Sequence, residues 1–190
     1  MLLGAGISFC HCQGYQGCDG DVGYELTTPP PPPVHSFSNG DVYEGELVDG
    51  QMDGRGVYRY AGGNVYAGFF NKGKPHGPNA VFTYSNGDRY EGPYVNGLKD
   101  TSESNGQGVY TFSKDGAVYT GPFKANMREG HGAVMTWPDG RKYEGSFLQS
   151  KRHGIGTVHK KDGRWDVIRY EAGKKKERLE SSYGAKLGSL

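Results

Sequence analysis

Cysteine and histidine are the side chains that would carry metal or covalent chemistry in this chain. Cys10, Cys12 and Cys18 all lie near the start, with His11 between the first two. Thiolates and imidazoles bind zinc, but this spacing matches no standard zinc motif, and a flexible segment is the simpler interpretation. The cysteines leave S-acylation open, whereas Leu2 removes the N-myristoylation signal. Three cysteines make no disulfide framework, which favours a reducing, intracellular setting.

Catalytic residues are the next chemistry to consider, and the other histidines fall into recurring patterns. His76 and His153 each stand in a repeated His-Gly pair, and His131 lies between two glycines. A residue that recurs with the same neighbours belongs to a repeated structural unit. The chain also has no nucleophile elbow, P-loop or zinc-protease helix motif. We therefore predict that the protein is not an enzyme and takes no cofactor, metal or small-molecule substrate.

Tyrosine is the residue whose spacing organises the chain. Five Tyr-x-Gly segments recur in phase, at intervals of roughly 24 residues with one longer interval. Four residues after each tyrosine comes a large apolar residue, and three residues before it comes a glycine. Such coupled positions mark a repeat protein, and repeats build extended surfaces that usually bind partners. The tyrosines are Tyr43, Tyr66, Tyr90, Tyr119 and Tyr143, and the apolar residues are Leu47, Phe70, Tyr94, Phe123 and Phe147.

The elements that must position these aromatics are β-hairpins. On a strand, Tyr43, Gly45 and Leu47 share one face. Residues 54–60 alternate in the same way and return the chain after a short polar loop, and an Asn-Gly, Gly-Gly or Asp-Gly turn leads into the next copy. Glycine leaves room for a neighbouring ring, which accounts for the 33 glycines and the 13% aromatic content.

The repeated pattern closely resembles the MORN repeat. It combines Tyr-Glu-Gly-x-apolar with His-Gly-x-Gly and Asn-Gly-Asp-x-Tyr, and residues 143–156 match it nearly throughout. The resemblance implies an all-β fold, an elongated single-layer antiparallel sheet of stacked β-hairpins. It also implies a scaffold or adaptor in a cytoskeletal, ciliary or flagellar assembly, as in radial spoke head proteins. The expected location is cytoplasmic, on the cytoskeleton and in the axoneme of a cilium or flagellum.

The pattern divides the chain into three parts. Residues 1–33 are predicted to be a flexible segment with a polyproline linker, for which an SH3 or WW ligand role stays open. The repeat array is expected over 34–170, with five repeats starting near 39, 62, 86, 115 and 139 and a degenerate cap at 162–170. Residues 171–190 are expected to form a basic C-terminal tail.

Three departures from the pattern carry local predictions. Pro78 interrupts the Gly-x-Gly of the second repeat and predicts a bulge. The extra residues Leu98–Asn105 predict a polar loop, which is either a tolerated insertion or part of a binding side. In the cap, Asp166 stands where tyrosine is expected and Tyr170 keeps the apolar position. A strand before the first repeat is expected near Val34.

Partner binding is predicted on the aromatic face of the sheet. A single-layer sheet has little core, and exposed apolar surface marks an interaction site. The expected partner is a protein of a cytoskeletal or ciliary complex, or a second copy of the chain. The residues predicted to line this face are Tyr43, Tyr66, Phe70, Tyr90, Tyr94, Tyr119, Phe123, Tyr143, Phe147 and Trp137.

The distribution of charge along the chain suggests an alternative function. The formal net charge is +1, but residues 1–54 contain no Lys or Arg, whereas Lys174, Lys175, Lys176 and Arg178 form a basic cluster. This cluster is either a solvated tail or a site for anionic phospholipid, each cation contributing about 1 kcal/mol near an acidic membrane. A peripheral membrane module is therefore the second hypothesis. Without a nucleic-acid-binding fold, nucleic acid is not an expected partner.

Overall fold

The computed structural model describes residues 31–104 and 106–182. The chain separates into two units, Met1–Pro31 and Pro32–Leu190, and the second contains all the elements below. The cysteine cluster, the linker up to residue 30 and the last eight residues lie outside the described residues. The predictions made for those segments therefore stay predictions.

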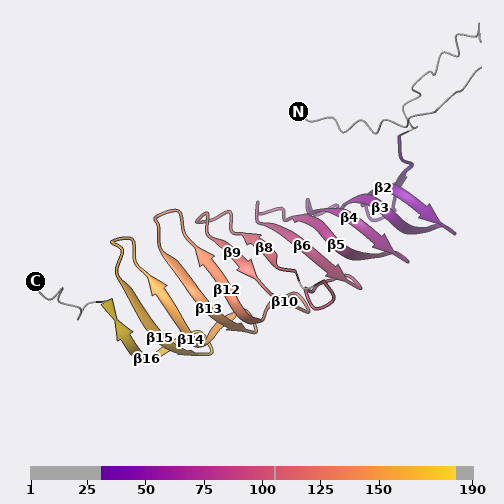
Figure 1. Ribbon diagram of the computed structural model, residues 1–190. Coiled ribbons are helices and arrows are strands. Elements are labelled where there is room, and N and C mark those ends of the chain that lie inside the picture. Colours follow the sequence, from indigo (N-terminus) through magenta and orange to yellow (C-terminus); the bar gives the residue numbers. More distant parts are fainter. Residues whose placement is uncertain (1–30, 105, 183–190) are drawn as a thin grey trace, which may run out of the picture. The chain divides into compact units, whose positions relative to one another are not determined.

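The described residues form strands joined by short turns, as the period-two pattern predicts (Figure 1). The strands are β1 (Val34–Ser36), β2 (Val42–Val48), β3 (Gln51–Arg59), β4 (Val65–Asn71), β5 (Lys74–Thr83), β6 (Arg89–Val95), β7 (Leu98–Lys99), β8 (Gly108–Thr111), β9 (Val118–Gly121), β10 (Phe123–Lys124), β11 (Met127–Arg128), β12 (Gly130–Thr136), β13 (Lys142–Leu148), β14 (Lys151–His159), β15 (Trp165–Glu171) and β16 (Lys174–Ser181).

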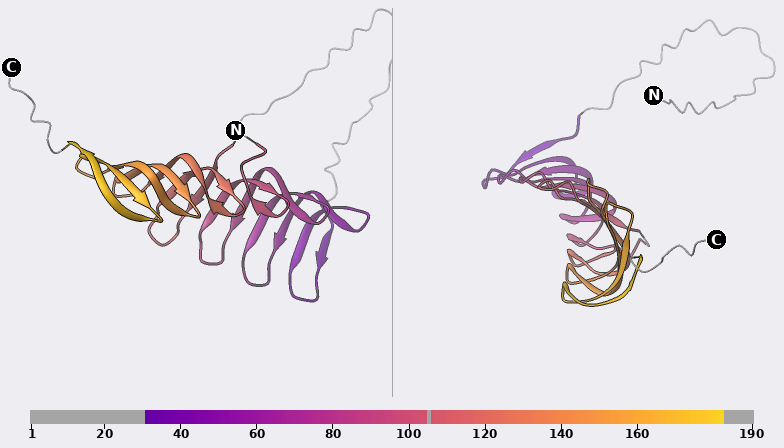
Figure 2. Two further views of the ribbon diagram at one scale, coloured as in Figure 1. Left: turned by 90° about the horizontal axis from the view of Figure 1, so that it is seen from below. Right: turned by 90° about the vertical axis from the view of Figure 1, so that its left-hand side faces the viewer.

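One antiparallel sheet of 14 strands runs through the unit, and its order follows the sequence from β1 to β16. Three short strands lie outside this order: β7 pairs only with β6, and β10 and β11 form a separate two-stranded sheet. Apart from these three short strands, each strand neighbours the next one along the chain, and the sheet is a single twisted layer whose strands are bowed (Figures 1 and 2). The predicted fold class, a single-layer antiparallel sheet of stacked hairpins, is confirmed.

The register places the repeated aromatics in one row across the sheet. Tyr43 pairs with Tyr58, and Tyr58 pairs with Tyr66 on its other side. The row continues through Phe82 to Tyr90 and so on to Tyr143. We call the side of the sheet that bears this row the tyrosine face. The opposite side, the valine face, bears Val57, Val81, Val109, Val134 and Val167.

Bulges occur where the sequence breaks its alternation. The β5–β6 register shifts between Gly77 and Ala80, on either side of Pro78, so the predicted bulge is present. Similar shifts lie beside the repeated glycines, for example between Gly45 and Leu47. A bulge bends its strand, so these regular shifts account for the bowed strands.

The insertion in the third repeat is packed against the next hairpin. Thr101 is buried, and its amide donates to the Phe123 carbonyl at 3.0 Å. Its Oγ1 donates to that carbonyl at 3.2 Å and accepts from the Phe123 amide at 3.1 Å. Asp100 accepts from the Ala125 amide at 3.2 Å. This part of the insertion extends the pairing at the point where β9 ends before Pro122.

The C-terminal boundary of the array differs from the prediction. Residues 174–181 form β16, an edge strand paired with β15, where a basic tail was expected from residue 171. Within the described residues, the sheet therefore extends to Ser181 and not only to residue 170. The reason is that Lys and Glu on an exposed edge strand resemble a solvated tail in sequence, since neither face of such a strand needs apolar residues.

Candidate partner-binding face

The five repeated tyrosines form the core of the tyrosine face. Each is 0% exposed, and they are the largest fully buried side chains among the described residues. Each hydroxyl donates to the carbonyl three residues later, for example Tyr43 to Glu46 at 2.8 Å and Tyr90 to Pro93 at 3.0 Å. Burial raises the pKa of each of these tyrosines, to about 12 at Tyr143. The hydroxyl therefore stays protonated and fixes the ring over the glycines.

The apolar residues four positions later complete this core, since each ring packs edge-on between two tyrosines. Phe70 lies 5.2 Å from Tyr43 and 4.9 Å from Tyr66, measured between ring centroids, with interplanar angles of 81° and 77°. Phe147 bridges Tyr119 and Tyr143 in the same way, at 5.1 and 5.5 Å. Edge-to-face pairs are the favoured geometry for such rings. A fully buried row in a single layer places this face on the inner side of the bowed strands.

This burial concerns the residues that were predicted to bind a partner. Nine of the ten lie in the core and present almost no surface, and neighbouring rings pack edge-on against them. They are Tyr43, Tyr66, Phe70, Tyr90, Tyr94, Tyr119, Phe123, Tyr143 and Phe147, none more than 4% exposed. The tenth, Trp137, is half-buried and remains open to a partner.

A second set of rings forms a continuous row along the same face and stays partly exposed. Adjacent rings in this set lie 4.5 to 6.0 Å apart between centroids. Phe37 is 42% exposed, and the others are half-buried. We call this row the aromatic ladder; it contains Phe37, Tyr58, Tyr60, Phe82, Tyr84, Tyr110 and Phe112. None of these residues was predicted to bind a partner, although an aromatic-x-aromatic pattern at the end of the return strands of the first three repeats marks most of them.

Aspartates in the turns hold the ladder tyrosines in place. Asp41 accepts from the Tyr58 hydroxyl at 2.7 Å and from the Ala61 amide at 2.8 Å. Asp88 does the same for Tyr110 at 2.9 Å and for the Ser113 amide at 2.8 Å. Burial and the Asp41 bond raise the pKa of Tyr58 to about 12. The Asp of the repeated Asn-Gly-Asp turn therefore positions the surface ring of the neighbouring strand.

Three partly buried cations lie over rings of the tyrosine face. Lys99 Nζ is 5.0 Å from the centroid of Tyr84, and Arg152 Cζ is 4.4 Å from that of Tyr143. Arg128 Cζ is 5.3 Å from Phe147. Burial lowers the pKa of both Lys99 and Arg128. The sequence interpretation assigned these cations no role.

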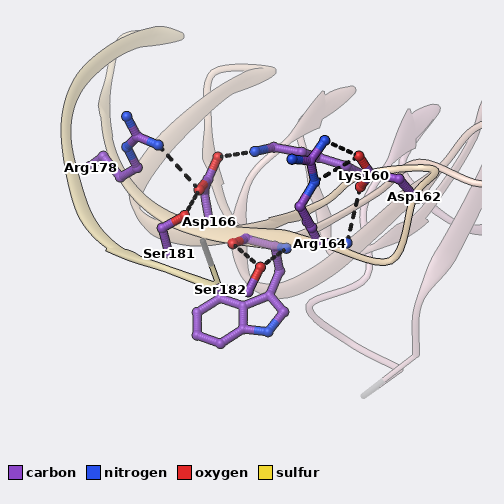
Figure 3. A network of polar contacts seen from close by, with 8 residues as sticks. Lys160, Asp162, Arg164, Asp166, Arg178, Ser181 and Ser182 are labelled. Carbon is purple, nitrogen blue, oxygen red and sulfur yellow. Dashed lines mark hydrogen bonds and ion pairs between the residues drawn. The ribbon is translucent and has the colours of Figure 1, made fainter. Parts of the chain in front are cut away.

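The last repeat replaces the core tyrosine with a charged network (Figure 3). The Asp166 carboxylate accepts from Ser181 Oγ at 2.6 Å and lies 2.9 Å from Lys160 Nζ and 3.6 Å from an Arg178 nitrogen. The Ser181 and Lys160 contacts hold the pKa of Asp166 at about 2. Tyr170 packs against Tyr143 at 5.7 Å. The predicted cap is therefore a modified repeat, tied to β16 by ion pairs.

The predicted lipid-binding residues lie on β16 and are partly engaged in ion pairs. Lys176 pairs with Glu171 at 2.9 Å, and Arg178 pairs with Asp166. Lys174 and Lys175 are exposed, and the structure gives them no carboxylate partner among the described residues. Half of the predicted basic cluster thus neutralises acids of the sheet.

Two further findings concern the described residues only. No group of three or more His, Cys, Asp or Glu side chains is placed to hold a metal ion within 31–104 and 106–182. In the same ranges, no helix has the length and apolar character needed to cross a membrane.

Comparison with known proteins agrees with the repeat structure. A family model for the MORN repeat matches residues 43–65, 66–89, 103–116, 119–140 and 143–163, more than half of the chain. The third match begins at 103 because the insertion displaces the second half of that repeat. Alsin from Rattus norvegicus is 33% identical over 90 residues, which are 47% of this chain. Alsin from Homo sapiens is 32% identical over 90 residues.

The chain spans only 5% of the length of these alsins. Among solved structures, the SAS-4 TCP domain in complex with a proline rich motif of Ana2, from Drosophila melanogaster, is similar over 62% of this chain and 60% of that chain. That similarity has a TM-score of 0.41 and 15% sequence identity.

Proposed function

The chain belongs to the MORN repeat family, whose repeats are generally non-enzymatic modules that bind proteins or membranes, and from that premise we propose that it is a protein-binding scaffold. The aromatic ladder is the proposed contact surface, together with Trp137. The buried tyrosines act indirectly, because they hold the ladder strands in register. This proposal keeps the predicted face and changes the residues that touch the partner.

The aromatic ladder is the observation that carries the proposal. Rings that pack mainly against one another keep one edge or face available to a partner, and they lose little conformational entropy on binding because their neighbours already hold them. Aromatic residues are also enriched among the residues that dominate interface energies. The ladder runs across strands β3, β5 and β8, so it supports an elongated partner lying along the sheet.

The proposed setting is a cytoskeletal or ciliary assembly, in the cytoplasm and on an axoneme. This part of the proposal rests on the functions of similar repeat proteins, and a partner found in such an assembly would support it. Self-association is the other form of protein binding that the ladder permits.

The test compares two double variants for capture of partners from ciliated cells, with cross-linking to identify the contact. Tyr60→Ala with Phe112→Ala removes two ladder rings. Phe69→Ala with Ile155→Ala is the matched control, since these side chains are 38% and 55% exposed and lie on the valine face. Loss of two interface aromatics is expected to weaken binding by about 2 kcal/mol or more, and the control is expected to bind as the unmodified protein does.

Both variants are first compared with the unmodified protein by circular dichroism and thermal unfolding. A ladder variant that folds and still captures every partner contradicts the proposal. Cross-links confined to the valine face contradict it as well.

Peripheral membrane binding is the second candidate, and the exposed Lys174 and Lys175 favour it. Each lysine near an anionic surface contributes about 1 kcal/mol, so two of them support only weak attachment. Sedimentation with phosphatidylserine vesicles tests this candidate: replacement of both lysines by Gln should abolish co-sedimentation if the lysines carry it.

A further inference from the structure

One position of the repeat changes character along the tyrosine face. It is the residue that pairs across the hairpin with the buried apolar residue of each repeat, as Met52 does with Leu47 and Arg152 with Phe147. In the first two repeats this position is apolar, and in the later ones it is a cation. The residues in order are Met52, Pro75, Lys99, Arg128, Arg152 and Lys175.

Aromatic rings surround the three central cations. Lys99 Nζ lies within 5.0 to 5.7 Å of the centroids of Tyr84, Tyr90 and Tyr110. Arg128 and Arg152 each lie over three rings as well, at 5.3 to 5.5 Å and at 4.4 to 5.5 Å. Contact with ring faces compensates only part of the lost hydration of a cation.

No carboxylate compensates the rest. The structure pairs none of these three cations with an acid among the described residues, whereas on the valine face Arg89 pairs with Glu91 and Lys142 with Glu144 at 3.1 Å. Arg89 and Lys142 on the valine face are therefore neutralised by acids of the chain. The three central cations of the tyrosine face have no acidic partner among the described residues, which leaves their charge available to a ligand.

Each of the three cations makes one side-chain hydrogen bond to another described residue. Arg128 donates from one guanidinium nitrogen to the Ser150 carbonyl at 2.9 Å, and Arg152 donates to the Tyr170 hydroxyl at 3.4 Å. Lys99 donates to the Tyr84 hydroxyl. A guanidinium has five donors and an ammonium has three. An open cavity of about 230 Å³ lies between Lys99 and Arg128, with Ser150 in its wall.

The spacing of the cations defines the ligand that fits them. Adjacent repeats are two strands apart, about 10 Å, and seven residues of an α-helix rise about 10.5 Å. We propose that the tyrosine face binds an acidic amphipathic helix of a partner protein, whose apolar side chains contact the aromatic ladder and whose carboxylates, spaced seven residues apart, pair with Lys99, Arg128 and Arg152. This inference deepens the proposed scaffold function and rests on it.

The probe is a synthetic amphipathic helix with Leu along one side and Glu at three positions spaced by seven residues. A second helix of the same sequence carries Gln in place of each Glu. Both are titrated against the whole chain by fluorescence anisotropy. The Glu helix is expected to bind about tenfold or more tightly than the Gln helix. Its affinity is expected to fall as the salt concentration rises from about 50 to about 300 mM, because salt screens charge pairs.

Single variants locate the effect. Lys99→Gln and Arg152→Gln are each expected to weaken the Glu helix about tenfold and to leave the Gln helix unchanged. Arg89→Gln and Lys142→Gln are matched controls that remove a cation from the valine face, and neither should change either affinity. Met52→Arg adds a cation at the equivalent place in the first repeat, and it should strengthen binding of a Glu helix extended to reach it.

Three results would overturn the inference. Equal affinity for the two helices would show apolar docking without charge recognition, which leaves the scaffold proposal intact. Binding of neither helix rejects the acidic helix as ligand, while capture of partners by the ladder still tests the scaffold separately. Vesicles of phosphatidylserine and phosphatidylcholine that bind through Lys99 and Arg152, in place of the Glu helix, would assign the cations to a membrane.

Discussion

Gly92 and Tyr90 show at the scale of single residues how this sequence specifies its core. A Cβ added at Gly92 would lie 2.7 Å from Tyr90 Oη and 2.9 Å from Gly108 Cα. The ring of each repeat therefore occupies the space that side chains would take on the same and the neighbouring strand. The pairing of repeated tyrosine with repeated glycine was visible in the sequence, because both recur in phase. The Tyr hydroxyl bond to the following Pro93 carbonyl was not, since it depends on the bend of the strand.

Substitution of Gly92 tests this arrangement. Gly92→Val is expected to destabilise the protein by about 3 kcal/mol, because the backbone of Gly108 and the Tyr90 ring cannot both move away. Urea unfolding followed by circular dichroism measures the change. Gly97→Ala is a useful comparison, since the nearest atom to its added Cβ is at 4.0 Å, and its cost comes from its positive φ of 87° instead. A Gly92→Val protein with unchanged stability would show that the ring lies elsewhere.

Asp166 gives a prediction on pH at the same scale. Hydrogen bonds from Ser181 and Lys160 lower the pKa of its carboxyl group in the folded protein to about 2, from an ordinary value of 3.8. A lowered carboxyl pKa stabilises the fold above the unfolded pKa, and this contribution is lost as the pH falls through the folded one. Asp166→Asn should therefore be less stable than the unmodified protein at pH 7, with the difference shrinking between about pH 4 and about pH 2. Urea midpoints at several pH values measure it, and a constant difference contradicts the assignment.

At the scale of elements, the structures of two segments could not be predicted from the sequence: the insertion Leu98–Asn105 and the edge strand β16. Repeat spacing located the insertion, but Thr101 packing under Phe123 depends on contacts across 22 residues. β16 was predicted as a tail because most of its residues are charged, and what orders it is the partner strand β15. Strand pairing of this kind is set by the neighbour and not by the composition of the strand itself.

Removal of β16 tests whether this strand stabilises the sheet through its backbone pairing or through its charged side chains. A chain that ends at Gly173 exposes the edge of β15 and leaves Asp166 without Ser181 and Arg178, so we expect a lower melting temperature and concentration-dependent aggregation. The control keeps the strand and replaces Lys174, Lys175 and Lys176 with Gln, which should change the melting temperature little. Light scattering during thermal unfolding reports both effects. Equal behaviour of the two proteins would mean that β16 contributes charge alone.

At the scale of the whole sheet, the order of strands follows directly from the repeat, because each hairpin contacts only its neighbours in sequence. That is why the architecture could be predicted from five tyrosines, while the exposure of each ring could not. The face on which a residue lies follows from its odd or even position along the strand. Whether its ring is buried or exposed depends on how the strand bends. Cross-strand positions such as Lys99 and Arg152 become equivalent only once the register is known.

The uneven lengths of the strands have a mechanical consequence. β8 and β9 have four residues each, whereas β13 has seven and β14 has nine. A force that pulls the two ends of the sheet apart acts on every strand ladder at once, since each strand is joined only to its neighbours in the sheet. Apart from the three-residue edge strand β1, the short ladders around β8 and β9 would yield first, and the hairpins on either side would separate as two intact pieces. In an assembly that stretches this protein, the third repeat would therefore separate at a lower force than the hairpins on either side of it.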